Sequence, residues 1–446
     1  MWLVGDTRYR RRSVLGIAAA LAAGRATLGG TVASVADRIV MSALAAAAAE
    51  LSASLTGNEY PAPLRTVNVS TRSELDAALA NAQPGDHIVL ADGSYGSIRL
   101  AIDVRGTSAN PVVIRAANKL GAALPGGFDL SADSRYVMLW GLNLDQANSL
   151  LRGVGHVIRR CYLRPNFDAS GTSIAIAASA GSDCRIDYCD LVMYTDAETG
   201  GWNSGALQSA IRQGAGGAVG NMMIRLTIHR CKLVGGQTRD TYSAPYGGFI
   251  TTAQNVTESE IETEWTVRYC WGAGLPTRHT IIEAKSSKNT FEYLHISTSS
   301  ASGYVACRQG HQNTLRGCSL DCHARIFRGP SNNVHSCSFS NNRKLQIMAG
   351  IVKYTDFTND PPQAYKTLVS DIKGPNASII VGEKFNSSYM EPALGSVIEA
   401  VEPAITYKLH QNTTVRSSIV DGPPPIAPVT LTANDVGVDA PWQGEN

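Results

Sequence analysis

The segment Arg160-Cys161-Tyr162-Leu163 contains a short cysteine-centred phrase that recurs along the middle of the chain. Each copy follows an alternating apolar stretch, such as His156-Val157-Ile158. In later copies the cysteine slot is filled by Cys189, Cys231, Cys270, Leu294, Cys318 and Cys337. Consecutive slots are 28, 42, 39, 24, 24 and 19 residues apart.

This spacing predicts an all-β fold, a right-handed single-stranded parallel β-helix. Intervals of roughly 20 to 45 residues are typical of stacked repeats. The units contain short strands and turns with no helical period, which favours a β-solenoid. A small apolar residue at one fixed slot would form an inward ladder with copies about 4.8 Å apart. The two longest intervals require an inserted loop or an extra coil.

Nine cysteines in an exported protein would usually suggest disulfides. Their ladder positions instead predict that most are buried small hydrophobes. Cys318 and Cys337 lie on adjacent expected coils, at a spacing that a disulfide could bridge. Cys318, Cys322 and His323 are too few ligands for a zinc site.

The composition suits a turn-rich β protein, with 42 glycines but only eight phenylalanines among 446 residues. By length the chain could hold two or three domains. A solenoid adds coils along one axis, so a single solenoid domain can also reach this length. The net charge of +2 gives no reason to expect a nucleic-acid partner.

The N-terminus is typical of an export signal. Arg10-Arg11-Arg12 precedes an apolar run from Ile17 to Ala23, which is similar to a twin-arginine signal. We therefore expect residues 1–36 to be removed and the protein to be periplasmic or secreted, without stable membrane insertion. An ordinary Sec signal or a membrane anchor remains an alternative, although the run is short for a membrane span.

The rest of the chain is expected in three parts. Residues 37–63 form a linker or helix, in which the Ala-rich stretch from Val40 to Leu55 could cap the solenoid. Residues 64–420 form the β-helix, and residues 421–446 a Pro-rich tail. Within the β-helix we expect a helix near Ser73 to Leu79, coils from Ile98 to Phe339, and a long Gly-rich loop over residues 192–222.

The entry segment carries a family resemblance. It reads Leu90-Ala91-Asp92-Gly93-Ser94-Tyr95 and then Gly106-Thr107-Ser108-Ala109-Asn110-Pro111-Val112. With the coils, this segment resembles polysaccharide lyase family six, the chondroitinase B and alginate lyase group, over roughly residues 64–440. Several β-helix families share the block, so it supports the fold more than the chemistry.

Two later segments resemble that family's catalytic strands. Ile281 to Asn289 is similar to the pattern Ile-Ile-x-x-Lys-Ser-x-x-Asn, and Gly303 to Asn313 to the pattern Gly-x4-Arg-His-Gly. The slots Leu294 and Cys318 place these segments one coil apart, so Lys285 and Arg308 should project close together.

The resemblance implies that Lys285 removes the C5 proton of a uronic acid and that Arg308 acts where the C4 oxygen leaves. A lysine base must be neutral, so its pKa must fall from about 10.4 through burial or nearby cations. Arginine is a poor literal proton donor, so Arg308 would stabilise the leaving oxygen or deliver a proton through water.

The sequence departs from the family at the metal site. Family members carry Glu-x-Glu ending five residues before the lysine, and these carboxylates bind calcium; here Arg278 and Thr280 occupy the positions. The resemblance therefore implies a protein without its calcium cofactor, in which Arg278 holds the substrate carboxylate instead. Calcium would otherwise neutralise that carboxylate and acidify the C5 proton.

The other candidate substrate-binding residues flank this pair. Glu283 shares a strand face with Lys285, and pairing between them would keep the lysine charged. Gln309 replaces the family's usual histidine, but the nearby His311 could supply a second proton carrier. One coil further, a segment resembling the family's Gly-Gly-x-Arg strand holds residues that could bind carboxylate or sulfate: His323, Arg325 and Arg328. A solvated outer face is an equal alternative for Arg328.

These residues predict a lyase that cleaves an anionic, uronate-containing polysaccharide of the alginate or glycosaminoglycan type by β-elimination, without calcium. A non-catalytic carbohydrate-binding β-helix that has lost the metal site is the alternative. A hydrolase of the polygalacturonase type needs several aspartates on neighbouring coils, whereas only Asp321 occurs between residues 285 and 325.

Overall fold

The protein is described by a computed structural model that covers residues 59–166, 173–195, 198, 208–214, 219–236, 248–253, 260–276, 280–299, 302–327, 329–340, 342–348, 366–374, 377–383, 396–399, 401, 405–409, 413–427 and 431–443. Tyr60–Pro441 form one compact unit, to which everything below refers. The expected signal and the Val40 to Leu55 stretch lie outside the described residues. Within the described ranges, no helix has the length and apolar character needed to cross a bilayer.

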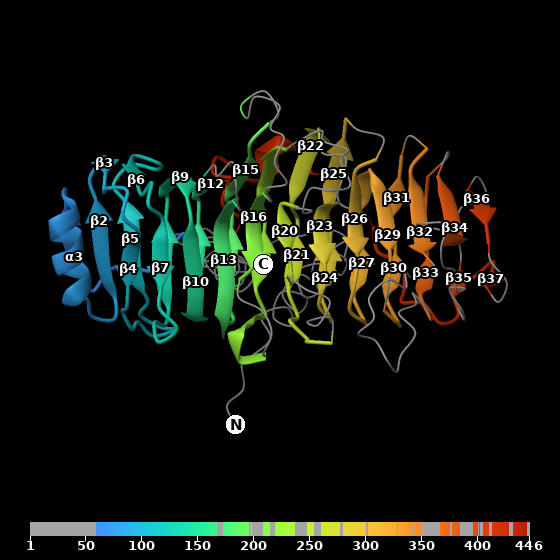
Figure 1. Cartoon of the computed structure of the whole chain (residues 1–446), viewed down its shortest axis with the longest axis horizontal. Helices are drawn as coiled ribbons and strands as arrows, with labels where there is room; N and C mark the ends of the chain where they lie inside the picture. The colour runs from blue at the N-terminus through green and yellow to red at the C-terminus, as the bar shows by residue number, and fades with distance from the viewer. Residues whose placement is uncertain are drawn as a thin grey trace, which may run out of the picture. The chain divides into compact units, whose positions relative to one another are not determined.

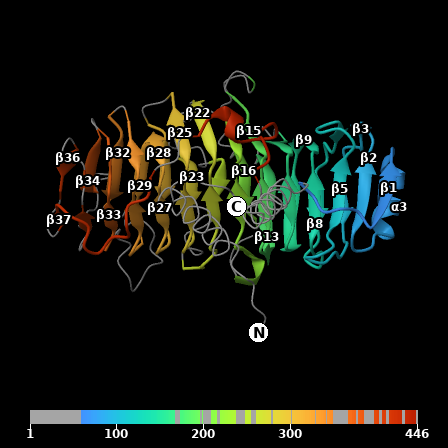
Figure 2. The same cartoon turned by 180° about the vertical axis from the view of Figure 1, so that it is seen from behind.

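Three parallel sheets run along the axis of the unit (Figures 1 and 2). Sheet A contains, in order, β1 Arg65–Val69, β2 Asp86–Leu90, β5 Val112–Ala116, β8 Val137–Trp140, β11 Val157–Arg159, β14 Arg185–Asp187, β18 Thr227–His229, β21 Thr266–Arg268, β24 Thr290–Glu292, β27 Thr314–Arg316, β30 Asn333–His335, β33 Leu368–Ser370, β35 Val397–Glu399 and β37 Thr414–Arg416. Sheet B contains β3 Gly93–Ser94, β6 Ala122–Ala123, β9 Asn143–Ala147, β12 Tyr162–Pro165, β15 Asp190–Met193, β19 Lys232–Gly235, β22 Trp271–Leu275, β25 His295–Thr298, β28 Ser319–Asp321 and β31 Ser338–Phe339.

Sheet C is the one that carries the candidate site. Its strands are β4 Leu100–Ile102, β7 Phe128–Leu130, β10 Ser149–Val154, β13 Ser173–Ser182, β16 Gln208–Gln213, β20 Ile250–Thr251, β23 Thr280–Ala284, β26 Tyr304–Cys307, β29 His323–Ile326, β32 Lys344–Met348, β34 Ser378–Glu383 and β36 Thr406–Lys408, with β17 Met223–Ile224 paired beside β13. Sequential strands of each sheet pair in parallel, which requires the right-handed crossovers of a parallel β-helix. The predicted fold class is confirmed.

The N-terminal end of the solenoid is covered by helix α3, Arg72–Ala80. Thr71 caps the helix, and Glu74 returns a hydrogen bond to the cap backbone to complete a capping box. Leu75 and Leu79 are buried in the same core as the first coils. The capping helix that the structure describes therefore comes from the entry segment.

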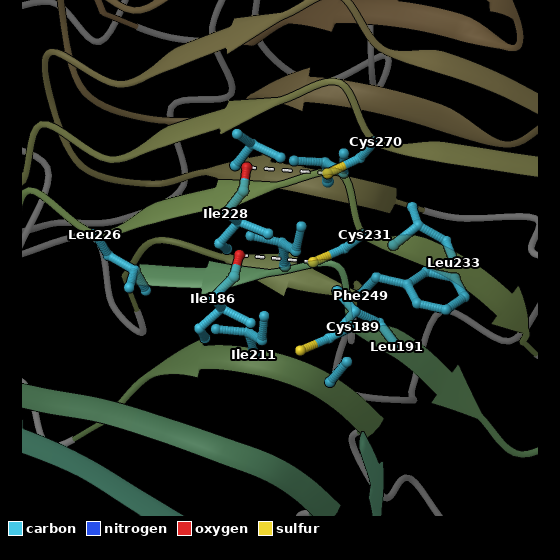
Figure 3. Packing of buried hydrophobic residues seen from close by; sticks show 14 of the residues in the cluster. Ile186, Cys189, Leu191, Ile211, Leu226, Ile228, Cys231, Leu233, Phe249 and Cys270 are labelled. Atoms are coloured by element: carbon cyan, nitrogen blue, oxygen red, sulfur yellow. Dashed lines mark hydrogen bonds between the residues drawn. The ribbon is translucent and has the colours of Figure 1, made fainter. Parts of the chain in front are cut away.

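The cysteine ladder is confirmed. The cysteines of the repeated slot are free and buried, and each thiol faces a carbonyl oxygen of the preceding coil. Figure 3 shows two such contacts: Cys231 Sγ lies 3.6 Å from Ile186 O, and Cys270 Sγ lies 3.9 Å from Ile228 O. Because β14 pairs with β18 and β18 with β21, the two long intervals hold inserted loops rather than extra coils.

The residue before each ladder slot takes a left-handed backbone conformation. The φ values are 58° at Arg160, 53° at Tyr188, 52° at Arg230 and 54° at Tyr269. This conformation is uncommon for residues other than glycine, and here it recurs at the corners between sheets A and B that carry the cysteine slot. The recurring phrase in the sequence therefore marks one corner of the coil.

One expectation about the extent of the coils was wrong. Residues 192–222 contain β16, whose Ala210 and Ile211 are buried in the core, so this segment is not only a loop. The apolar alternation of β16 is short and has glycines on both sides, so the sequence pattern did not indicate a strand. Parallel pairing begins at β1 and ends at β37, so coils occur on both sides of the stretch from Ile98 to Phe339 and lie within the expected β-helix range of residues 64–420.

The chain after the last coil turns back along the solenoid. Ile426 N–H donates to Ser336 Oγ at 3.0 Å, and Gly437 N–H donates to Arg230 O at 2.9 Å. Lys119 Nζ lies 2.6 Å from Asp439 Oδ1. A short 3-10 turn, Ala433–Asp435, lies between these contacts. The Pro-rich segment is thus packed against the coils.

Candidate active site

One row of side chains on the outer face of sheet C organises the candidate site. Ile211, Ile250 and Ile282 face the core at one register position of β16, β20 and β23. The residues that follow at the next position point outward, because side chains alternate along a strand. We call this row the axial column: Arg212, Thr251, Glu283, Ala306, Arg325 and Gln346.

Glu283 joins the two predicted catalytic residues. Its Oε2 lies 3.2 Å from Lys285 Nζ, and Arg308 Nη1 donates to its Oε1 at 3.1 Å. The side chain of Glu283 is fully buried, whereas those of Lys285 and Arg308 are 10% and 30% exposed. Lys285 and Arg308 therefore lie together, as their spacing predicted, with a buried carboxylate between them.

The pKa of Lys285 is lowered from its usual value. Burial is the main cause; Glu283 opposes it, while the cations Arg308 and Arg212 act in the same direction as burial. The pKa of Glu283 is also lowered, because Lys285 and Arg308 together outweigh the effect of burial on this carboxyl group. The cluster thus holds an ionised Glu283 beside a lysine that is easier to deprotonate than one in water.

A hydrogen-bonded turn fixes the backbone at Lys285. Lys285 N–H donates to Thr252 Oγ1 at 3.1 Å, and the hydroxyl of Ser286 lies 2.7 Å from the same oxygen. Asn289 Nδ2 donates to Ser286 O at 2.9 Å and to Asn313 Oδ1 at 3.0 Å. The serine and asparagine of the Lys-Ser-x-x-Asn pattern therefore support the turn that presents the lysine.

That turn belongs to an internal asparagine ladder. Asn289 N–H donates to Asn313 Oδ1 at 2.9 Å, and Asn313 N–H donates to Asn332 Oδ1 at 3.0 Å. All three side chains are buried. Each buried amide satisfies the backbone of the neighbouring coil, which keeps the turns after β23 and β26 in register.

The remaining predicted residues lie in different surroundings. The His311 imidazole is 3.5 Å from exposed Glu260, and His323 Nδ1 accepts a hydrogen bond from Lys344 N–H at 3.0 Å. Arg325 Nε donates to Gln346 Oε1 at 2.6 Å. Of these residues, the register places Arg325 in the axial column with Glu283.

Arg325 rests on an aromatic platform that the sequence did not reveal. Its guanidinium lies 4.1 Å from the centre of the Tyr304 ring and 6.0 Å from that of Phe327. The two rings are 5.8 Å apart and form a small cluster with Ala306, separate from the core. Stacking and the Gln346 contact hold this arginine in one orientation.

The described residues at this place do not offer the oxygen ligands that calcium prefers. Thr280 lies buried in β23 opposite Tyr304, and both oxygens of Glu283 already face cations. Among the described residues, no group of three or more His, Cys, Asp or Glu side chains could hold a metal ion. Arg278 and Arg328 lie outside the described residues.

Comparisons with known proteins agree with this architecture. Residues 69–157 match the Chondroitinase B family model. The resemblance to polysaccharide lyase family six is confirmed. No curated protein matches the chain.

The solved structures with the same fold include lyases of this family. The polysaccharide lyase Pedsa3628 from Pseudopedobacter saltans is 15% identical, with 84% of this chain and 100% of that chain covered and a TM-score of 0.59. A mannuronic acid specific family 6 lyase from human gut microbiota is 17% identical, with coverages of 78% and 83% and a TM-score of 0.57. The alginate lyase AlyF-OU02, solved in complex with G6, is 12% identical, with coverages of 79% and 84% and a TM-score of 0.54. At such identities the likeness concerns the fold.

Proposed function

We propose that the protein is a polysaccharide lyase that cleaves a uronate-containing anionic polysaccharide by β-elimination. The observation that carries the proposal is the largely buried Lys285, with its lowered pKa, beside Arg308 on the outer face of sheet C. The two residues occupy the positions that the family resemblance assigns to the reacting pair. The neighbouring structures described as alginate and family 6 lyases support this class of substrate.

The reaction divides between Lys285 and Arg308. Neutral Lys285 takes the C5 proton of the uronate, and the electron pair of that bond forms the C4–C5 double bond. The C4–O bond breaks, and its electron pair leaves with the oxygen. Arg308 lies 3.1 Å from Glu283 and keeps its charge, so it stabilises the developing negative charge on the leaving oxygen until water supplies a proton.

Glu283 positions this pair and does not itself bind substrate. A fully buried carboxylate cannot reach a sugar in solvent, and both of its oxygens are directed at Lys285 and Arg308. The carboxylate opposes deprotonation of Lys285, but burial and the two arginines outweigh it. Glu283 therefore fixes the distance between Lys285 and Arg308, and in return it reduces the fraction of Lys285 that is neutral.

We also propose that the reaction does not use calcium. Thr280 and Arg278 replace the family's carboxylates, and the charge around Lys285 is supplied by Arg308 and Arg212. In this scheme Arg278 contributes to holding the substrate carboxylate. Export by the twin-arginine-like signal in residues 1–36 would bring the enzyme to polysaccharides in the periplasm or outside the cell.

Incubation with alginate, chondroitin and dermatan tests the function. A lyase produces an unsaturated uronate, which absorbs in the ultraviolet as the reaction proceeds. New reducing ends without that absorbance would mean hydrolysis instead.

One observation favours a second candidate, a non-catalytic carbohydrate-binding protein. Lys285 Nζ lies 3.2 Å from Glu283 Oε2, and this ion pair favours a charged lysine, which cannot act as a base. Binding of a uronan with no product of either kind would support this second candidate.

A further inference from the structure

A second arginine faces the candidate site from the opposite side to Arg325. Arg212 of β16 pairs with Thr251 of β20, and Thr251 pairs with Glu283 of β23. Arg325 of β29 lies two strands from Glu283 in the other direction. With strands about 4.8 Å apart, the two arginines flank Glu283 at about 9.6 Å each along the axis.

The strand that carries Arg212 is firmly placed. Ile211 is fully buried in the core, and its N–H donates to Phe249 O at 2.8 Å. Gln213 is also buried, and its Oε1 accepts a hydrogen bond from Met223 N–H at 3.2 Å. The half-buried Arg212 between them is directed outward by strand alternation, and its charge lowers the pKa of Lys285. A charge that acts on the lysine also acts on a substrate bound over it.

The axial column matches the repeat of an extended polysaccharide. A sugar residue in such a chain is about as long as the distance between neighbouring strands, so a polymer running along the solenoid axis places one sugar near each strand. Between the charged positions the column carries only the short side chains of Thr251 and Ala306. The arginines at its two sides are therefore spaced to meet carboxylates about two sugars away from the reacting uronate.

We propose that Arg212 binds the carboxylate of a uronate on the β16 side of the cleaved bond and contributes to selecting a polymer that carries a charge there. This inference rests on the proposed lyase function. Arginine suits the role because its planar guanidinium can engage a carboxylate through two parallel hydrogen bonds. The residue would strengthen substrate binding and, through its charge, keep Lys285 easier to deprotonate.

The test compares Arg212→Ala and Arg212→Lys with the wild type. On alginate polymer, Arg212→Ala should raise KM by about tenfold or more, since hydrogen bonds between ionised groups are the strong class, and kcat should change less. On oligosaccharides too short to reach β16 the KM should be nearly unchanged. Arg212→Lys should restore part of the loss. The acidic limb of the pH profile, along which Lys285 loses its proton, should move to higher pH, because a cation that lowers the pKa of Lys285 is gone.

Arg225→Ala is the matched control. Arg225 is half-exposed and pairs with an equally exposed Asp183, so its removal should leave KM and the pH profile unchanged. An unchanged KM and pH profile in folded Arg212→Ala would overturn the inference, as would the same loss in Arg225→Ala.

Equilibrium binding separates this inference from the proposed function. Alginate binding is measured with Lys285→Ala and with Lys285→Ala/Arg212→Ala. Both variants lack the proposed base, so the comparison reports binding without turnover. Weaker binding by the double variant supports Arg212 even if the wild type forms no unsaturated product, an outcome that would reject the lyase alone. Equal binding by the two variants rejects the role of Arg212.

Discussion

Replacing Glu283 by glutamine removes the charge that links the reacting pair while keeping its shape. In the wild type, the buried carboxylate lies 3.2 Å from Lys285 Nζ and 3.1 Å from Arg308 Nη1. Breaking a buried ion pair by removing one partner typically costs about 3–5 kcal/mol. Because the Arg308 side chain is 30% exposed and partly solvated, we expect Glu283→Gln to lose an amount near the lower end of that range.

The stability loss should depend on pH in a defined direction. The pKa of Glu283 is lowered in the folded state by Lys285 and Arg308, which outweigh burial. Its stabilising contribution is therefore complete above the unfolded carboxyl pKa of about 4.3 and disappears as the pH falls through the folded value. The difference in unfolding free energy between wild type and Glu283→Gln should be full near neutral pH and shrink in acid.

The same substitution should make Lys285 a better base at lower pH. Glu283 raises the pKa of Lys285, so its loss lets the pKa fall further under burial and the neighbouring arginines. The acidic limb of the pH profile of kcat, along which Lys285 loses its proton, should move to lower pH. Maximal kcat should fall, because Lys285 and Arg308 lose the group that positions them.

Glu292→Gln is the control for these measurements. Glu292 is a buried carboxylate on sheet A that contacts Arg268 and Arg316, far along the coil from Lys285. Its replacement should lower the free energy of unfolding without moving the acidic limb of the kcat pH profile. The reasoning fails if Glu283→Gln unfolds with the wild-type free energy at neutral pH. It also fails if the acidic limb of the kcat pH profile does not move in Glu283→Gln, or moves equally in Glu292→Gln.

Two further outcomes follow from the site. Lyase turnover should persist after incubation with a chelator, and a large loss that calcium alone restores would contradict the calcium-independent scheme. Asn313→Ala should cost about 1–3 kcal/mol in unfolding free energy, because it leaves buried donors of Asn289 without an acceptor. The exposed Asn118→Ala should stay within about 0.5 kcal/mol of wild type, and similar losses in both variants would count against the ladder.

The architecture was predictable because one slot repeats. Each cysteine must fit a small inward space on the next coil, so the spacing of Cys161, Cys189 and Cys231 reports the coil length directly. The same logic placed Lys285 beside Arg308, since their segments lie one slot apart. The short helix near Ser73 to Leu79 also followed from local sequence.

The parts that escaped prediction depend on long-range contacts. β16 is short and flanked by glycines, so its alternation is too brief to stand out, and Arg212 was hidden with it. Tyr304 of β26 and Phe327 after β29 meet Arg325 only when neighbouring coils stack, so local sequence did not indicate this aromatic platform. The buried amide of Asn332 completes a ladder that only the stacked coils create.

Product formation by wild type and Lys285→Ala tests the central claim most directly. The wild type should release an ultraviolet-absorbing unsaturated uronate from at least one of alginate, chondroitin and dermatan. Folded Lys285→Ala should be slower by about 10²- to 10⁴-fold, the usual cost of losing a general base. Lys288→Ala, an exposed lysine paired with Glu262, should retain the wild-type rate. Turnover near the wild-type level in Lys285→Ala, with an unchanged circular dichroism spectrum, would contradict the assignment of the base.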